Sequence, residues 1–138
     1  MPLITRTLIK TSLIYLVLAL SLGMVLVAVP LVDIYTPPGL TPLFFHLFMV
    51  GWVAQLIFGV AVWMFPKYSM KYPRGNENLT WVAYGLLNIG IVLRVIGEPM
   101  QSASPAPVWG WILAASATAQ WLAGLGFGWN FWTRVKER

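Results

Sequence analysis

Long apolar runs alternate with short polar or proline-containing segments along the whole chain. Four runs, at about 8–31, 42–65, 79–97 and 108–132, are each long enough to cross a membrane as an α-helix. The connections between them are short and contain helix breakers, so successive helices are expected to be antiparallel neighbours. The pattern predicts an all-α membrane protein, an antiparallel four-transmembrane-helix bundle that forms a single domain over residues 1–138.

Basic residues lie at alternate ends of these runs. They precede the first run, separate the second from the third and follow the fourth: Arg6, Lys10, Lys67, Lys71, Arg74, Arg134, Lys136 and Arg138. Because cytoplasmic loops of membrane proteins carry the excess of Lys and Arg, both termini and the middle loop are predicted to be cytoplasmic. We expect the protein to be integral to the cell (inner) membrane, with the lipid bilayer as its surroundings.

Composition narrows the possible functions. Hydrophobic residues make up 59% of the chain and charged residues 9%, which is typical of a membrane protein. The net charge of +5 does not indicate nucleic acid, since the basic residues lie at the ends of apolar runs and form no stripe. The absence of cysteine excludes thiolate metal sites, and one histidine with few acids cannot build a hydrolytic metal site. We therefore expect no enzyme activity from this chain alone.

Small and amide residues inside the runs predict how the helices pack. Gly51, Gln55 and Gly59 form a stripe where a second helix can approach closely and the glutamine can hydrogen-bond across. Gly124 and Gly128, together with Gly126, give the fourth run a similar pattern. Polar groups in hydrocarbon need partners, so Asn88 and Gln120 are expected to form interhelical hydrogen bonds.

His46, the only histidine, is the main candidate for chemistry. It lies about one turn below the outer surface, and Arg94 of the third run lies at a similar depth. His46 is interpreted either as a metal ligand or proton relay, or as a histidine hydrogen-bonded to a neighbouring helix. Arg94 either holds an acidic ligand group or extends to the headgroups and pairs with Glu98, four residues later.

An apolar stripe accompanies His46 on an α-helical projection. It contains Val50, Val53, Ile57, Val60 and Met64, which suits a haem face and equally suits packing against a helix. Trp52 is expected deeper in the membrane, and its ring is likewise interpreted either as a contact for a flat ligand or as part of the packed core.

The sequence around His46 resembles a known family. The segments His46–Trp52, Ile57–Val60 and Met64–Pro66 are similar to the second transmembrane helix of haem-copper oxidase subunit I and its smaller relatives, which include nitric oxide reductase and NnrS-type membrane haem proteins. The resemblance covers one to two helices. It implies that His46 is an axial ligand of haem b and that Arg94 contacts a haem propionate. The remaining haem and copper ligands of that family are missing, so this chain cannot be an oxygen or nitric oxide reductase by itself.

The resemblance therefore favours a membrane haem b protein for electron transfer or for gas or redox sensing. Its second axial ligand is expected to be His46 of another copy in a homodimer or larger homo-oligomer, or a methionine such as Met49 or Met100. Two alternatives stay open: a non-catalytic accessory or assembly subunit with a respiratory-chain partner, and a small dimeric transporter.

Overall fold

The computed structural model of this chain describes residues 1–32, 34–36, 38–70 and 73–135, and within them every regular element is a helix. The elements are α1 (Leu3–Ala28), a 3₁₀ turn η1 (Val29–Val32), α2 (Leu40–Phe45), a π-helix η2 (His46–Ala54), α3 (Gln55–Met64), α4 (Glu77–Ala103) and α5 (Pro107–Trp132). The all-α prediction is confirmed. Lys71, Lys136 and Arg138, used above to orient the chain, lie outside the described residues.

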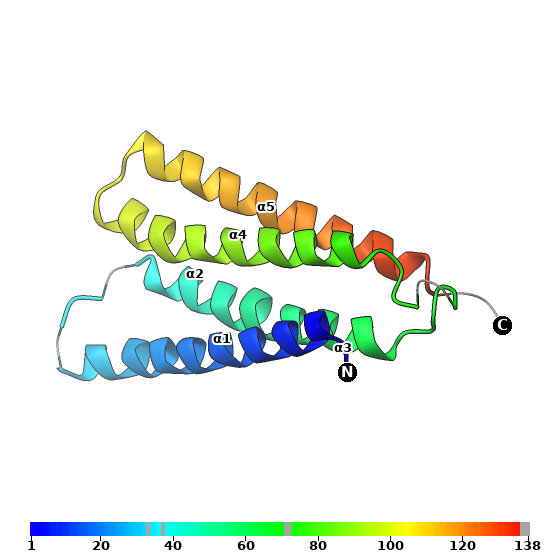
Figure 1. Cartoon of the computed structure of the whole chain (residues 1–138). Coiled ribbons are helices and arrows are strands. Elements are labelled where there is room, and N and C mark those ends of the chain that lie inside the picture. Colours follow the sequence, from blue (N-terminus) through cyan, green and yellow to red (C-terminus); the bar gives the residue numbers. More distant parts are fainter. Residues whose placement is uncertain (33, 37, 71–72, 136–138) are drawn as a thin grey trace.

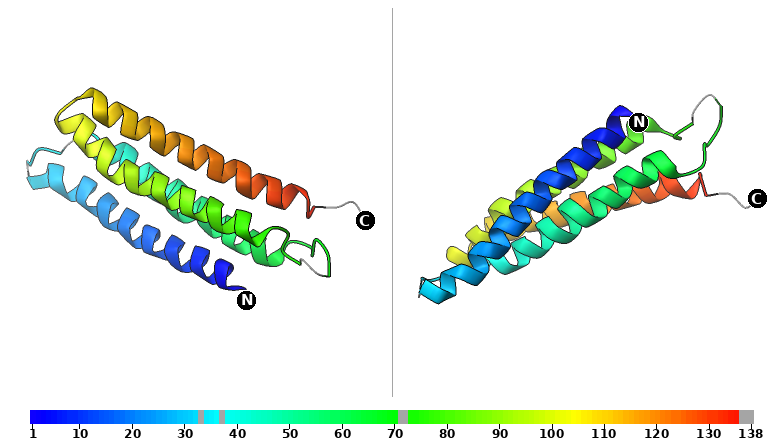
Figure 2. Two further views of the ribbon diagram at one scale, coloured as in Figure 1. Left: turned by 45° about the horizontal axis from the view of Figure 1, so that its top comes forward. Right: turned by 90° about the horizontal axis from the view of Figure 1, so that it is seen from below.

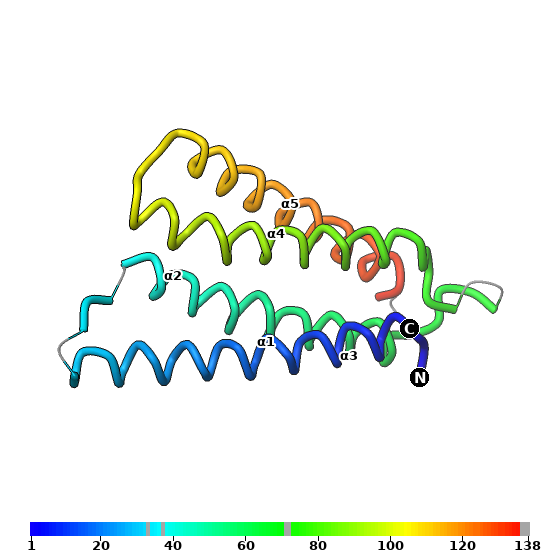
Figure 3. Tube along the Cα trace, turned by 60° about the vertical axis from the view of Figure 1, so that its left-hand side comes forward, coloured from blue at the N-terminus to red at the C-terminus, as the bar shows by residue number. Residues whose placement is uncertain are grey.

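The helices form two hairpins that lie against each other (Figure 1). In the first hairpin α1 packs along the rod made by α2, η2 and α3, and in the second α4 packs along α5. Figures 1 and 2 place α1 and α5 on opposite sides, with α4 and the α2–α3 rod between them. The tube in Figure 3 shows that α1 begins and α5 ends at the same end of the bundle as the loop after α3. We call this end proximal and the opposite end distal.

Within the described residues, three helical segments are long and apolar enough to cross a membrane: Leu3–Val32, Leu40–Met64 and Glu77–Ala103. The fourth rod, α5, has a similar length of 26 residues and is not among them. Its sequence is rich in tryptophan and glycine, which contribute far less hydropathy than leucine or valine. The structure therefore confirms a helical protein with candidate membrane-spanning helices.

Local sequence explains where these helices begin and end. The side chain of Asn76 caps α4 by accepting a hydrogen bond of 3.0 Å from the Leu79 N–H, and Glu77 lies in the first turn, where an acidic side chain is favourable. Pro107 opens α5 at a position where no N–H is needed. The α3 helix stops at Met64 because Pro66 favours an extended conformation at Phe65, which has φ −65° and ψ 150°.

Two features of the helices differ from the sequence-based expectation. The third helix does not end near Gly97 but continues through Pro99 to Ala103, so Glu98 is a helical residue and not part of a connection. A proline so close to the helix end removes one hydrogen bond without stopping the last turn. The second rod is not α-helical throughout, because nine residues from His46 to Ala54 form the π-helix η2.

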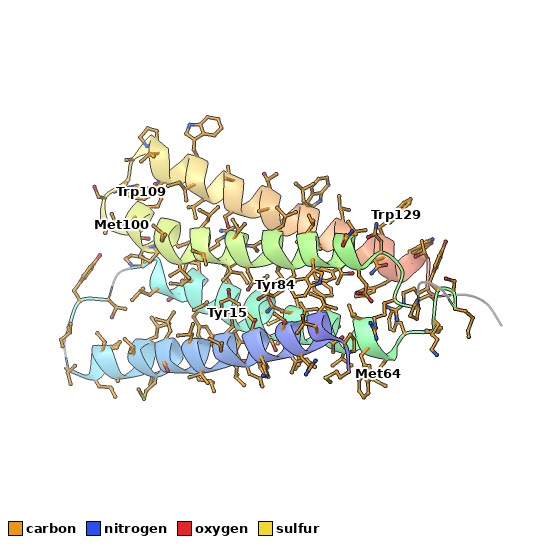
Figure 4. All side chains as sticks on the ribbon, in the orientation of Figure 1. Tyr15, Met64, Tyr84, Met100, Trp109 and Trp129 are labelled. Carbon is orange, nitrogen blue, oxygen red and sulfur yellow. The ribbon has the colours of Figure 1, made fainter. Side chains whose placement is uncertain are left out.

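The two hairpins are joined by a shared core and by hydrogen bonds at several levels. Tyr15, Leu47, Leu87, Ile91 and Phe127 are among the buried side chains of the core. Near the middle, the Tyr15 hydroxyl donates to Asn88 Oδ1 at 2.9 Å, and the hydroxyls of Thr11 and Tyr84 lie 3.0 Å apart. Figure 4 labels both tyrosines where α1 faces α4. The expected interhelical role of Asn88 is confirmed, whereas Gln120 donates to Ser116 of its own helix.

A third connection joins the hairpins at the proximal end through Arg134, which is only 1% exposed. Its guanidinium donates to three carbonyl oxygens at the end of α3, those of Val62 (3.1 Å), Phe65 (2.7 Å) and Pro66 (3.1 Å). The last carbonyls of a helix have no partner within the helix, so a basic side chain there supplies the missing donors. Arg134 is therefore part of the packed structure, a role that its position in the sequence does not indicate.

The glycine stripe of the second rod packs against α1 as predicted. A Cβ atom at Gly51 would lie 2.8 Å from Tyr15 Cγ, and one at Gly59 would lie 3.0 Å from Leu8 Cβ. Between them, the fully buried Gln55 donates to the Leu8 carbonyl at 3.4 Å. The stripe on α5 differs, since no atom of another described segment lies within 4 Å of a Cβ atom built at Gly124 or Gly128.

This contrast gives a matched pair of substitutions. Gly51→Ala is expected to lower the stability of the protein by about 1–3 kcal/mol, because the new methyl group overlaps the Tyr15 ring. Gly124→Ala is expected to raise stability by up to about 1 kcal/mol, since alanine is the better helix former and meets nothing. Thermal melting of both variants in one detergent checks the pair, and equal melting temperatures would contradict the packing described for Gly51.

Candidate functional site

The candidate site lies at the distal end, where the start of the second rod meets the last turns of α4. Gly39 comes directly before α2 and touches α4 so closely that a Cβ atom there would overlap the carbonyl of Glu98. A Cβ atom at Gly39 would also lie 2.6 Å from the Ser102 hydroxyl oxygen. Only glycine permits this approach. It brings the first turns of the second rod against α4 and so places His46 beside Glu98.

His46 makes its contacts through one ring nitrogen. Its Nδ1 atom lies 3.0 Å from the carbonyl oxygen of Pro42, one turn earlier, and 3.2 Å from Glu98 Oε1. Both neighbours are acceptors, so Nδ1 carries the proton and the lone pair of the neutral ring is on Nε2. The side chain is 27% exposed, and among the described residues Nε2 makes no hydrogen bond and is not fully buried.

Glu98 connects His46 to Arg94. Its Oε1 atom accepts a hydrogen bond of 3.0 Å from Arg94 Nη1 and also faces His46 Nδ1, so one oxygen serves both groups. The Glu98 side chain is 6% exposed and that of Arg94 19%, which places an ion pair largely out of solvent. Such a pair is tolerated in an apolar environment because each charge compensates the other.

Three polar atoms of this cluster lack hydrogen-bond partners among the described residues. They are Glu98 Oε2, Arg94 Nε and Oε1 of Gln101, all buried. Gln101 follows Glu98 by three residues on α4, a spacing that places two side chains on the same helix face. Buried polar atoms in native structures normally have partners, so this cluster retains capacity for further hydrogen bonds.

The π-helix begins at His46 and changes the faces expected for the residues that follow. In a π-helix each backbone hydrogen bond joins residues five apart instead of four. A projection based on 3.6 residues per turn therefore no longer applies between His46 and Ala54. Val50 and Trp52 pack against the core, and Val53 is partly buried. Met49 is 53% exposed and Met100 40%. Of the two methionines named as a possible second axial ligand, Met49 is therefore the more accessible.

The arrangement resembles the support that metal-binding histidines commonly have. A carboxylate or carbonyl that accepts from one ring N–H fixes the tautomer and the orientation of the ring, and it makes the other nitrogen a better ligand. The same support suits proton acceptance at Nε2. Short π-helical segments within α-helices also occur frequently at functional sites.

Sequence reasoning placed Arg94 and Glu98 together correctly but assigned Glu98 to Arg94 alone. The structure shows that Glu98 contacts His46 as well as Arg94. The sequence held one signal for the contact between His46 and Glu98: the start of the second rod and the end of α4 were expected at the same depth. The Pro42 carbonyl was also missed, although the four-residue spacing to His46 is the usual one for a bond within a helix turn.

Comparisons with known proteins do not assign this site. No protein-family model, no curated protein and no solved structure matches the chain.

Proposed function

We propose that this protein binds haem b in the membrane, with Nε2 of His46 as an axial ligand of the iron. The observation that carries the proposal is that two acceptors, the Pro42 carbonyl oxygen and Glu98 Oε1, lie within hydrogen-bonding distance of Nδ1. Because these acceptors occupy Nδ1, Nε2 is the atom of this partly exposed ring that can coordinate the iron. A porphyrin needs only one or two protein ligands, which suits a site with a single imidazole.

The remaining residues fit this proposal in defined ways. Glu98 holds the imidazole in the tautomer that leaves Nε2 free, and Arg94 keeps a positive charge beside that carboxylate. The unpartnered Nε of Arg94 is a donor that suits a propionate oxygen. When bound, haem would supply one-electron transfer or gas binding. The second axial ligand is His46 of another copy, with the exposed Met49 as the alternative within one chain.

The topology that we propose places the proximal end in the cytoplasm. Lys67, Arg74 and Arg134 lie at that end, together with the start of α1 and its Arg6 and Lys10. We propose α5 as a fourth span, since it is as long as α1 and packs along α4. His46 and Glu98 then lie near the outer surface of the cell membrane.

The proposal predicts an optical signature. Protein purified from haem-replete cells is expected to show a Soret band, and His46→Ala is expected to remove it. His46→Gly with added imidazole should restore the band, because free imidazole can take the place of the missing ring. Ser21→Ala is the matched control, as this exposed hydroxyl bonds, within the described residues, only to the Val17 carbonyl of its own helix. A colourless wild-type protein, or a band of full height in His46→Ala, would rule the proposal out.

One observation favours a second candidate, an accessory subunit of a larger membrane complex. Trp121 and Trp129 of α5 are 64% and 72% exposed, and Gly124 and Gly128 between and beside them meet no other described segment. Small residues of this kind allow a helix of another protein to approach closely. Gly124→Leu should then release a co-purifying membrane subunit, while the Soret band of the isolated protein stays unchanged.

A further inference from the structure

The proximal end contains a cleft that the haem proposal does not use. It has a volume of about 660 Å³ and lies where the loop before α4 and the first turn of α4 face the last turns of α5. Tyr68, Arg74, Asn78, Trp129 and Thr133 are among its lining residues. This volume is within the usual range of small-molecule sites.

The walls of the cleft are fixed by hydrogen bonds from Asn130, which is 3% exposed. Its Oδ1 accepts from the Asn76 N–H at 3.3 Å, and its Nδ2 donates to Thr80 Oγ1 at 2.9 Å. Gly75 has φ 73°, a conformation that favours glycine, and a Cβ atom there would overlap Asn130 Oδ1. The loop is therefore held against α5, and the cleft is formed before any ligand binds.

Among the described residues beside this cleft, positive charge exceeds negative charge. Arg74 Nη1 bonds to Glu77 Oε1 at 2.9 Å, whereas among the described residues the guanidinium of Arg134 bonds only to carbonyl oxygens. The buried Nη1 of Arg134 has no partner in the part of the chain that the structure describes, and a Cβ atom at Gly75 in the cleft wall would lie 3.9 Å from Arg134 Cδ. Burial, and next the nearby charge of Arg74, lower the pKa of Arg134. Among the described residues, Arg74 has a carboxylate partner and Arg134 has none, and an anion would offset this excess of positive charge.

We propose that this cleft binds the phosphate headgroup of an anionic phospholipid. Basic pockets between helices at the cytoplasmic side of membrane proteins recognise such headgroups. The exposed rings of Tyr68 and Trp129 flank the cleft, and amphipathic aromatic rings favour the headgroup level of a bilayer. A lipid is the occupant that fits this place, because its phosphate meets Arg74 while its chains remain in the bilayer beside α4 and α5. The inference is independent of haem binding at the distal end.

The test is a titration of purified protein with phosphatidylglycerol and with phosphatidylcholine, read by native mass spectrometry. Wild-type protein is expected to retain phosphatidylglycerol preferentially, and Arg74→Gln is expected to weaken its binding roughly five-fold, as for the loss of one basic contact. Glu77→Gln should strengthen binding, because it removes the carboxylate that competes for Arg74. Arg6→Gln is the matched control, since it removes an exposed positive charge at the same end but outside the cleft.

Three outcomes would overturn the inference. The first is equal retention of the two lipids by the wild-type protein. The second is an equal loss of phosphatidylglycerol in Arg6→Gln and Arg74→Gln, which would show general attraction to the charged end. The third is competition by inorganic phosphate at the concentration of the lipid, which would identify a site for soluble anions.

Discussion

Arg134→Met is expected to lower the free energy of unfolding by about 3 kcal/mol or more, because a hydrogen bond from a charged donor contributes about 1.5–3 kcal/mol and Arg134 makes three. Methionine fills a similar volume but donates no hydrogen bond, so the carbonyls of Val62, Phe65 and Pro66 lose their common donor. Thermal and chemical unfolding in detergent measure the effect. Because the contact joins α5 to the end of α3, we also expect faster proteolysis in the loop after α3.

Two further substitutions separate the geometry of Arg134 from its charge. Arg134→Lys keeps the charge, but a single ammonium group cannot reach three carbonyls in the same way, so an intermediate loss of stability is expected. Arg6→Met removes an exposed charge at the same end of the bundle and should leave stability within about 0.5 kcal/mol of the wild type. If Arg134→Met and Arg6→Met melted alike, Arg134 would act only through its charge.

Glu98→Leu is the second substitution with a large expected effect, a loss of about 3 kcal/mol or more. It leaves the largely buried Arg94 without its carboxylate and removes the acceptor that faces His46. The double variant Arg94→Leu/Glu98→Leu removes both charges together, and its stability is expected to return close to that of the wild type, since apolar replacement of a buried ion pair is often neutral.

A double-mutant cycle over Arg94 and Glu98 measures this coupling directly. Additive losses from the two single variants would mean that the charges do not depend on each other, against the geometry of their hydrogen bond. Asn88→Leu serves as a control at another level of α4. Its loss should add to that of Glu98→Leu, because Asn88 bonds instead to Tyr15 and to the Tyr84 carbonyl.

The sequence was sufficient for features that depend on neighbours along one helix. Apolar runs located the helical rods to within about five residues at each end, apart from the longer α4. The spacing of Gly51, Gln55 and Gly59 predicted a close approach by another helix, and α1 makes that approach. The pairing of Arg94 with Glu98 followed from a four-residue spacing. All these features rest on helical periodicity, which a sequence displays directly.

Features that depend on contacts between helices could not be read in this way. Glu98 faces His46 because Gly39 allows α2 to touch α4, a contact between residues far apart in the chain. Arg134 was predicted only as a basic residue at the cytoplasmic end, because its position in the sequence gives no sign of its hydrogen bonds to the α3 carbonyls. The π-helix has no distinctive residue pattern, so the stripe projected from His46 assumed the wrong number of residues per turn.

The polar connections between the hairpins have a consequence for how the two halves align in the bilayer that we propose for this protein. Lipid chains are as apolar as leucine, so apolar contact alone leaves one hairpin free to slide past the other along the membrane normal. Arg134, Tyr15 and Glu98 bond across at the proximal end, near the middle and at the distal end. A displacement by one helical turn would break all three at once, so the halves have one vertical alignment in which every bond forms.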